Sequence, residues 1–448
     1  MLRYVEILFY QNHNPILYGS TNCMIKSTAN GSSELPEAFL DAVYEQLNYV
    51  DGTLLSAANL LQTELFDAVT WLEKGDWLSL AEKVGAEKIF FVKNDPIIIF
   101  CNSPDSDPQK LLTIFRRTWC MARPHFLYIA IPGELRVYSL NDYPARTVSE
   151  WEEVKPLAVV KKIADVSNIL YEYYRERVES GQVFKDKKAG QLDKRADKRL
   201  ILDLKTIRKN LLEMDPNIEQ RHIHAVIGRS IFIRYLEDRG ILTPDYFRRV
   251  AEDQNHPKWR SDWLQILETP ETRVLISGNE NNRYTRVLRN KDFTYALFNQ
   301  LAKHFNGDMF PRDLEEENAI TQKHLNLLRR FLLGDTDLRQ QKLFLWAYDF
   351  EIIPIELISS IYEEFYHKSS TKDKGTHYTP SVLVEYALSQ LLTPERLATT
   401  PKILDFACGS AIFLVQAFRR IVRYQESLSQ QPLSATELRQ ILREQITG

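Results

Sequence analysis

The sequence predicts an α/β plus all-α protein, with a mixed α/β domain first, a helical connector second and the beginning of a doubly wound α/β domain last. Three patterns support this fold class: short β-rich runs before residue 155, apolar residues at helical spacing from about 199 to 347, and a strand, turn and helix over 403–423. A chain of 448 residues also exceeds the roughly 250–300 residues at which one hydrophobic core stops growing. We therefore expect domains at 1–155, 156–350 and 351–448.

The composition excludes several classes of protein. The chain has 57 basic and 60 acidic residues and a net charge of −3, so binding to nucleic acid needs a local basic patch. Its aliphatic runs are far shorter than the roughly 20 residues of a membrane helix, and its N-terminus lacks a signal-peptide pattern. Four cysteines without CxxC spacing predict no disulfide framework. We expect a cytoplasmic protein that does not bind membranes.

Strand and hairpin patterns predict the N-terminal domain. Residues 89–92 and 97–100 are β-rich runs separated by a polar break, and residues 111–121 have the spacing of an amphipathic helix. Two further runs, 126–131 and 134–138, are joined by a Pro-Gly pair and predict a hairpin.

A basic linker follows at residues 181–210, where ten Lys or Arg stand against four Asp or Glu, a local net charge of +6. A solvated charged surface is the simpler interpretation, and a segment that contacts phosphates is the alternative. The candidate nucleic-acid contacts are Lys187, Lys188, Lys194, Arg195, Lys198 and Arg199.

The connector has the periodicity of packed helices. Apolar residues keep 3.6-type spacing over 200–212 and 224–242, and Gly240 is placed to end the second of these helices. This periodicity indicates packing rather than chemistry, and the chain has no internal repeat. Further helices are predicted over 259–267, 325–333, 338–348, 357–367 and 381–392.

Residues 403–423 contain the most informative pattern. An apolar strand, 403–406, leads through a turn of small residues into an amphipathic helix that begins at Ile412. Small side chains let a backbone approach a ligand closely, and a helix N-terminus offers unpaired N–H donors. In doubly wound sheets ligands lie at the carboxyl ends of strands, where Asp405 falls. From this pattern alone, an ordinary structural turn between strand and helix is an alternative.

The residues of this turn, and two motifs upstream, resemble a known family. Residues 405–414, Asp-Phe-Ala-Cys-Gly-Ser-Ala-Ile-Phe-Leu, resemble D-P-A-C-G-S-G-x-F-L, the S-adenosylmethionine motif of adenine-specific DNA methyltransferases. Residues 375–380, Gly-Thr-His-Tyr-Thr-Pro, resemble the family's G-x-[FH]-Y-T-P motif, and residues 361–365 resemble the I-Y-E-x-F run before it. Residues 224–242 and, less specifically, 111–138 are similar to parts of large single-chain restriction–modification and phage-defence enzymes.

The resemblance implies a Rossmann-like domain that binds S-adenosylmethionine and methylates adenine in DNA. It places a loop that includes Asp405 under the amino-acid moiety of the cofactor, and Thr379 at its methionine end. Two residues depart from the family pattern: Phe406 replaces a proline, and Ala411 replaces a glycine, where a Cβ could clash with the cofactor or conflict with a glycine-only conformation. The implied cofactor-binding residues are Tyr378, Thr379, Pro380, Asp405, Ala407, Cys408, Gly409, Ser410 and Phe413.

The family's catalytic motif is absent, because [NDS]-P-P-[YF] needs two adjacent prolines and the sequence has none. Residues 445–448 also fall where relatives begin the strand with the ribose-binding acid. We therefore predict no catalytic residue, no methylation by the chain alone and weak or no cofactor binding. In one hypothesis, a second chain or further sequence completes the enzyme and supplies target recognition. In the other, the chain is a non-catalytic DNA- or protein-binding fragment.

Two other candidate sites carry less weight. A metal-dependent nuclease needs a Glu-x-Lys on a strand, and the best match, at Glu153 and Lys155, is followed by Pro156 in a polar region. We interpret this pair as solvated surface charge. His222 and His224 are two residues apart and point to different faces of a helix, so we predict no metal site.

Overall fold

The computed structural model describes residues 35–57, 67–185, 194–271, 282–305, 313–334, 347–358, 361, 379–409 and 411–448. These residues divide into two compact units. We call them the sheet unit, within residues 35–196, and the helical unit, residues 197–426 and 433–448. Within the described residues, no helix is both long and apolar enough to cross a membrane.

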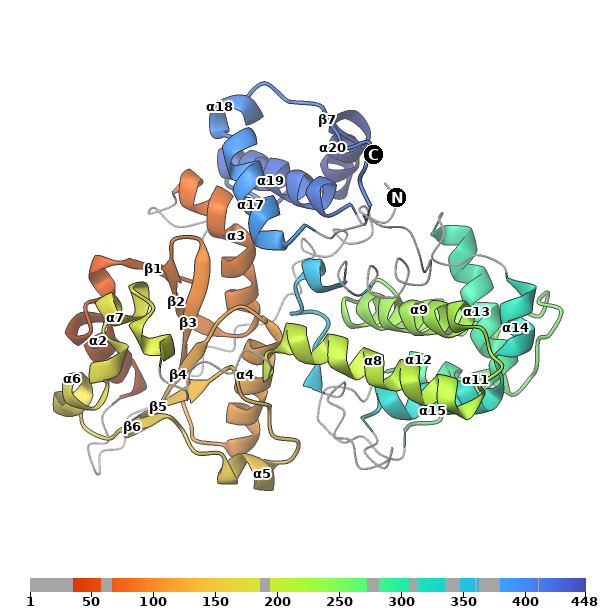
Figure 1. Ribbon diagram of the computed structural model, residues 1–448, viewed down its shortest axis with the longest axis horizontal. Coiled ribbons are helices and arrows are strands. Elements are labelled where there is room, and N and C mark those ends of the chain that lie inside the picture. Colours follow the sequence, from red (N-terminus) through yellow and green to blue (C-terminus); the bar gives the residue numbers. More distant parts are fainter. Residues whose placement is uncertain are drawn as a thin grey trace. The chain divides into compact units, whose positions relative to one another are not determined.

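The sheet unit is built on one six-stranded mixed sheet with the strands in chain order, as Figure 1 shows. Neighbouring strands are antiparallel except β3 and β4, which are parallel. Helix α4 (Pro108–Cys120) connects these two, as a parallel pair requires a crossover. The strands are β1 (Thr53–Ser56), β2 (Ala86–Val92), β3 (Asp95–Asn102), β4 (Phe126–Ile131), β5 (Glu134–Ser139) and β6 (Ala158–Val160).

The predicted hairpin is confirmed, since β4 and β5 pair from Ile131 opposite Glu134 to Phe126 opposite Ser139. The turn between them needs Gly133, whose φ of 83° lies in the left-handed region. The predicted strands 89–92 and 97–100 are also confirmed within β2 and β3.

The two faces of the sheet pack against different helices. Phe100 and Tyr128 belong to the buried cluster that also includes Phe39 and Tyr44 of α2 (Pro36–Gln46). On the opposite face, Tyr138 contacts Phe115 of α4 with ring centroids 5.9 Å apart. The other helices of this unit are η1 (Tyr49–Asp51), α3 (Ala68–Lys83), α5 (Val148–Glu153), η3 (Ile163–Asp165), α6 (Val166–Ile169), η4 (Tyr171–Tyr173), α7 (Arg175–Glu179) and η5 (Gln182–Lys185).

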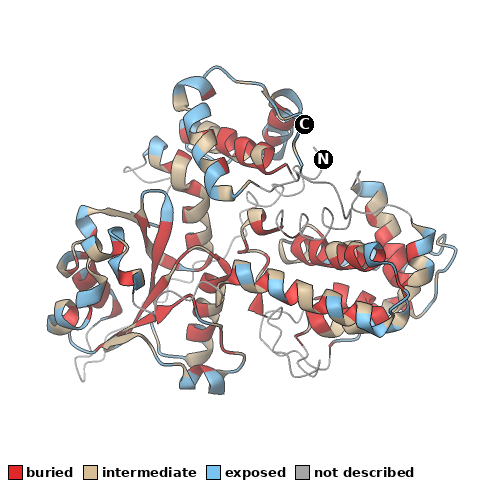
Figure 2. Cartoon of the chain, viewed as in Figure 1, coloured by how far each residue is buried: buried red, intermediate tan, exposed pale blue. Residues whose placement is uncertain are grey.

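The helical unit is organised around α9 (Gln220–Asp238), which is buried over most of its surface (Figure 2). As predicted, Gly240 ends this helix: it adopts a φ of 64°, and its N–H donates to the carbonyl of Glu237. The predicted helix 259–267 begins later, at Trp263, and helix 338–348 falls largely outside the described residues. The other helices are α8 (Ala196–Met214), α10 (Pro244–Ala251), α11 (Trp263–Glu268), α12 (Tyr284–Val287), α13 (Lys291–His304), α14 (Leu314–Ala319) and α15 (Gln322–Leu332).

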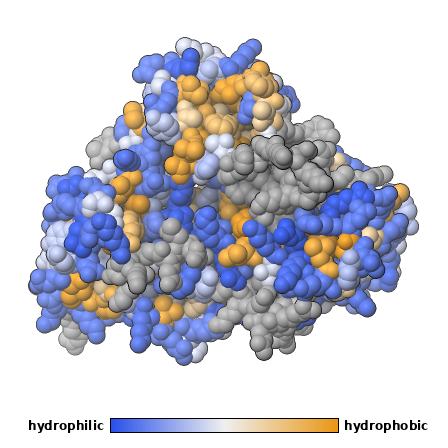
Figure 3. Space-filling model, in the orientation of Figure 1, coloured by the Kyte–Doolittle hydropathy of each residue, from blue (hydrophilic) through white to orange (hydrophobic). Residues whose placement is uncertain are grey.

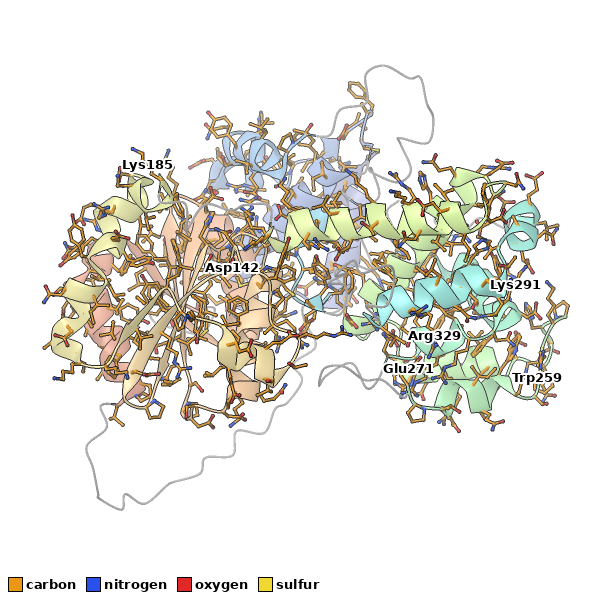
Figure 4. All side chains as sticks on the ribbon, turned by 60° about the horizontal axis from the view of Figure 1, so that its bottom comes forward. Asp142, Lys185, Trp259, Glu271, Lys291 and Arg329 are labelled. Carbon is orange, nitrogen blue, oxygen red and sulfur yellow. The ribbon has the colours of Figure 1, made fainter. Side chains whose placement is uncertain are left out.

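Ion pairs at a buried carboxylate connect separate segments of this unit. Glu271, which is 7% exposed, accepts hydrogen bonds from Arg289 and Arg329, and Figure 4 labels two of these three residues. The two arginines lower the pKa of the Glu271 carboxyl, although burial alone would raise it.

The C-terminal part of the helical unit contains a second, two-stranded sheet. Strands β7 (Ile403–Leu404) and β8 (Ile446–Thr447) pair in parallel, with Ile403 opposite Ile446 and Leu404 opposite Thr447. The strand predicted over 403–406 is therefore shorter than expected, and the helix predicted over 412–423 continues to Ser429. Of the predicted helix 357–367, only part lies within the described residues. The helices are α17 (Ser381–Leu391), α18 (Pro394–Leu397), α19 (Ile412–Ser429) and α20 (Ala435–Gln445).

Candidate cofactor site

The loop 405–411 lies at the carboxyl end of β7 and leads into the N-terminus of α19. At its start, the N–H of Asp405 donates to the carbonyl of Thr447 on the neighbouring strand at 3.0 Å. At its end, the N–H of Val415 donates to the carbonyl of Ala411 at 2.9 Å, which begins the helix. The loop is thus fixed by the sheet on one side and by the helix on the other.

Two residues of the loop have left-handed backbone conformations. Gly409 has a φ of 50° and Ala411 a φ of 63°. Ala411 thus adopts the left-handed conformation that the sequence analysis treated as a possible conflict, at a steric cost that glycine would avoid. The N–H of Ala411 donates to the carbonyl of Cys408 at 2.6 Å, and the methyl group of Ala411 is fully buried.

The remaining loop residues differ in exposure. Ala407 and Gly409 are exposed, whereas Asp405 and Cys408 are half-buried. One carboxylate oxygen of Asp405, Oδ1, accepts the N–H of Ala407 at 3.0 Å. Apart from the exposed Phe406, the loop therefore presents backbone and small side chains to solvent, and the Asp405 carboxylate bonds the loop's own backbone.

One aromatic residue lies within the loop and another lies just after it. Phe406, where the family has proline, is 92% exposed, and Phe413 is half-buried in the first turn of α19. Gly448 lies against the same helix, where a Cβ would approach Cδ1 of Leu414 to 2.3 Å. That position has no room for a side chain.

The upstream motif is only partly described. Thr379 is half-buried, and Pro380 is the exposed N-cap residue of α17 rather than a residue of its first turn. The side chain of Pro380 makes no capping hydrogen bond. Tyr378 and Ser410, two of the predicted cofactor-binding residues, lie outside the described residues.

Contacts that the sequence did not reveal hold α19 and the segment 350–356 in place. Glu356 Oε1 accepts hydrogen bonds from Gln416 and from Arg419, the latter at 2.8 Å. Arg239, just after α9, donates to the carbonyls of Phe350 and Ile353 at 3.1 and 3.2 Å. No local pattern marks such pairs, because their partners are 60 or more residues apart.

The structure places the predicted nucleic-acid residues mainly in intrachain contacts. Lys194 pairs with Asp142 at 2.9 Å, and Arg199 pairs with Asp203 at 2.8 Å. Arg195 donates to the carbonyl of Ala122. Lys198 is exposed on α8, while Lys187 and Lys188 lie outside the described residues.

The Glu-x-Lys pair is not on a strand. Glu153 is the last residue of α5, and Lys155 follows it in a segment without regular structure. This agrees with the interpretation of the pair as surface charge.

Comparison with known proteins finds a protein family that the C-terminal part of the chain resembles. The family model described as N-6 DNA Methylase matches residues 354–440, which include α17, β7, the loop and α19. Over these residues the chain is similar to the N-6 DNA methylase family. We call residues 354–440 the methylase segment.

A curated protein of Methanocaldococcus jannaschii, named "Putative type II restriction enzyme and methyltransferase", is similar over a longer stretch. It is 23% identical over 267 residues, which cover 55% of this chain and 21% of that protein. The chain therefore spans about a fifth of the length of this relative. No solved structure matches the chain.

Proposed function

We propose that this chain supplies S-adenosylmethionine-binding residues of an adenine-specific DNA methyltransferase from a restriction–modification or related defence system. The observation that supports this most is the loop 405–411, which combines small residues, left-handed backbone and a helix N-terminus at the carboxyl end of β7. We further propose that β7 and β8 are the first parallel strands of a Rossmann-like sheet.

The loop fits the proposed cofactor in two respects. Its exposed residues Ala407 and Gly409 allow close approach of a ligand to the backbone. The methyl group of Ala411 is buried, so it lies away from the exposed side of the loop where a ligand would approach. When bound, S-adenosylmethionine would supply an electrophilic methyl group, and the chain's own residues would orient its amino-acid end.

We propose that further polypeptide, in the same protein or in a second chain, supplies the acceptor motif and the target-recognition domain. The sequence has no adjacent prolines, and the chain spans 21% of its relative. The methylase segment also exposes large hydrophobic side chains, and orange surface lies over this part of the chain in Figure 3. By exposure, these side chains are Val382, Leu383, Tyr386, Leu391, Leu404, Phe406 and Leu428, which are 52–92% exposed.

Saturation-transfer NMR with S-adenosylmethionine tests cofactor binding, because this method detects the weak binding that we expect of the chain alone. We expect transfer to the methionine protons of the ligand and its loss in Asp405→Ala. Asp245→Ala, at an exposed acid of α10, is the matched control and should bind as the wild type does. No transfer at about 1 mM ligand, an affinity of about −4 kcal/mol, would contradict the proposal, as would equal transfer in Asp405→Ala.

DNA binding is best tested at Lys198. Reversing the charges of Lys194, Arg195 and Arg199 would break their intrachain contacts, so any effect on DNA could come from the fold. If Lys198 contacts a phosphate, Lys198→Ala should flatten the log–log salt dependence of binding by about 0.9 for every duplex sequence. Lys161→Ala, at an exposed lysine of the sheet unit, should leave the slope unchanged. A slope that is insensitive to Lys198 would remove this residue from the interface.

A further inference from the structure

His222 has a buried nitrogen that its surroundings leave unpaired. The residue lies in the first turn of α9, and its side chain is 4% exposed. Among the described residues, Nδ1 of His222 has no hydrogen-bond partner. The nearest carboxylate oxygen, Oδ2 of Asp313, is 3.8 Å away, which is too far for a direct hydrogen bond. A buried polar atom without a partner is costly, which points to a bound group between the two side chains.

Two carboxylates face this nitrogen from the start of α14. Asp313 is the N-cap of the helix, and its Oδ1 accepts the N–H groups of Glu315 and Glu316 at 3.0 and 3.1 Å. Its other oxygen, Oδ2, is the one near His222. Glu316 is 1% exposed, and one donor atom from each of His222, Asp313 and Glu316 lies within 4.8 Å of the others.

We propose that His222, Asp313 and Glu316 form a binding site for a divalent transition-metal ion, with Zn²⁺ as the best match. One imidazole and two carboxylates are typical ligands of zinc, whereas Mg²⁺ prefers oxygen ligands and retains water. Two donors on one ion at about 2.1 Å can lie up to about 4.2 Å apart. The His222–Asp313 pair already meets this limit, and the third donor needs a shift of about 0.6 Å or less.

The hydrogen bonds of Glu316 are compatible with this role. Its Oε1 accepts from Nη1 of Arg229 at 2.8 Å and from the hydroxyl of Tyr295 at 2.9 Å, and its Oε2 accepts from Nη2 of Arg229 at 2.5 Å. A carboxylate can accept about four such bonds, so one position on Oε2 remains. Carboxylate ligands are commonly oriented by hydrogen bonds of this kind. Arg229 also balances the charge of Glu316, so the carboxylate of Asp313 supplies the one net negative charge that remains to bind the cation.

An ion could reach this site through a neighbouring cavity. Arg229, Tyr295 and Asp313 also line a cavity of about 1040 Å³ between α9, α10, α13 and α14. Of the three proposed ligands, Asp313 lines this space, so water that enters it could complete the coordination.

Calorimetry with Zn²⁺ on chelator-treated protein tests the proposal. We expect one ion per chain with a dissociation constant below about 10 μM and much weaker binding of Mg²⁺. His222→Gln and Asp313→Asn should each weaken Zn²⁺ binding at least tenfold. Asn caps a helix as well as Asp does, so Asp313→Asn keeps α14 while removing one anionic ligand.

His224→Gln is the matched control. His224 lies on the same helix and is 2% exposed, but its Nε2 is 3.0 Å from Nε2 of Gln220. This variant should retain wild-type affinity for Zn²⁺. A second readout is the visible absorption of Co²⁺, whose bands should appear in the wild type and His224→Gln and be lost in His222→Gln. No Zn²⁺ binding by the wild type, or unchanged affinity in both His222→Gln and Asp313→Asn, would overturn the proposal.

Discussion

The buried pair of Arg229 and Glu316 gives a sharp test of how the helical unit is stabilised. Both side chains are 2% exposed, and the guanidinium forms two hydrogen bonds to the carboxylate. In Arg229→Met, the carboxylate keeps only the hydroxyl of Tyr295 as a donor among these partners. Because an uncompensated charge then remains buried, we expect the free energy of unfolding to fall by about 3–5 kcal/mol. That is a large share of the about 5–15 kcal/mol typical of a folded protein.

Removing both charges should restore most of this stability. A buried ion pair contributes little net free energy, because desolvation offsets the attraction between the charges. In Arg229→Met/Glu316→Leu the principal remaining defect is the hydroxyl of Tyr295, which loses its acceptor at a cost of about 1–3 kcal/mol. The double variant should therefore be more stable than Arg229→Met alone.

Hydrogen exchange of α9 peptides and urea unfolding, both in the presence of a chelator, measure these differences in the helical unit. Arg221→Met is the matched control, since Arg221 and Glu315 join the same two helices at 2.5 Å but are 53% and 76% exposed. An exposed pair of this kind contributes about 0–1 kcal/mol. A loss below about 1 kcal/mol in Arg229→Met, or a double variant less stable than either single variant, would refute the reasoning.

Three further predictions concern a histidine, the loop and the α9 terminus. Burial, helped by the charge of Arg195, lowers the pKa of His125 to about 4 in the folded protein, against 6.5 in the unfolded chain. The free energy of unfolding should therefore be highest above pH 6.5 and fall by roughly 3 kcal/mol as the pH drops to about 4. His125→Gln should flatten this dependence in urea unfolding at several pH values. Ala411→Gly should change the free energy of unfolding by less than about 1 kcal/mol, because relief of the left-handed strain offsets the lost burial of the methyl group. Ala411→Val should lower the free energy of unfolding by about 2 kcal/mol or more, and thermal unfolding measures both variants. Arg239→Ala should cost about 2 kcal/mol or more, since two backbone carbonyls lose a charged donor, and Arg239→Lys should recover part of that loss in the same measurement.

Local patterns in the sequence predicted the parts of the fold that depend on neighbouring residues. The hairpin of β4 and β5, the end of α9 at Gly240 and the turn before α19 follow from hydrophobic alternation, a glycine and a run of small residues.

Long-range contacts could not be predicted in the same way. The sequence predicted a strand at β7, but not its partner β8, which has two residues and pairs with β7 only because the chain returns after α19 and α20. The approach of His222 to Asp313 could not be predicted from the sequence, because it depends on how α9 packs against α14. The intrachain partners of the basic residues at 194–199, two carboxylates and one backbone carbonyl, are also not evident from the sequence. For that reason contact with phosphates stood as an alternative to a solvated charged surface for these residues.

The burial of α9 determines how the helical unit can be divided. Thirteen of its residues are buried, from His222 to Leu236, so the helix cannot detach without exposing the packed faces of its neighbours. The C-terminal end of α9 also contacts the residues just before the methylase segment, because Asp238 accepts the N–H of Phe350 and Arg239 donates to the carbonyl of Ile353. The amides of α9 should therefore be among the slowest to exchange, and they should open together with those of the segment they support. A derivative that begins after α9 would lose that support, so fragments meant to report on the methylase segment need to start before residue 220.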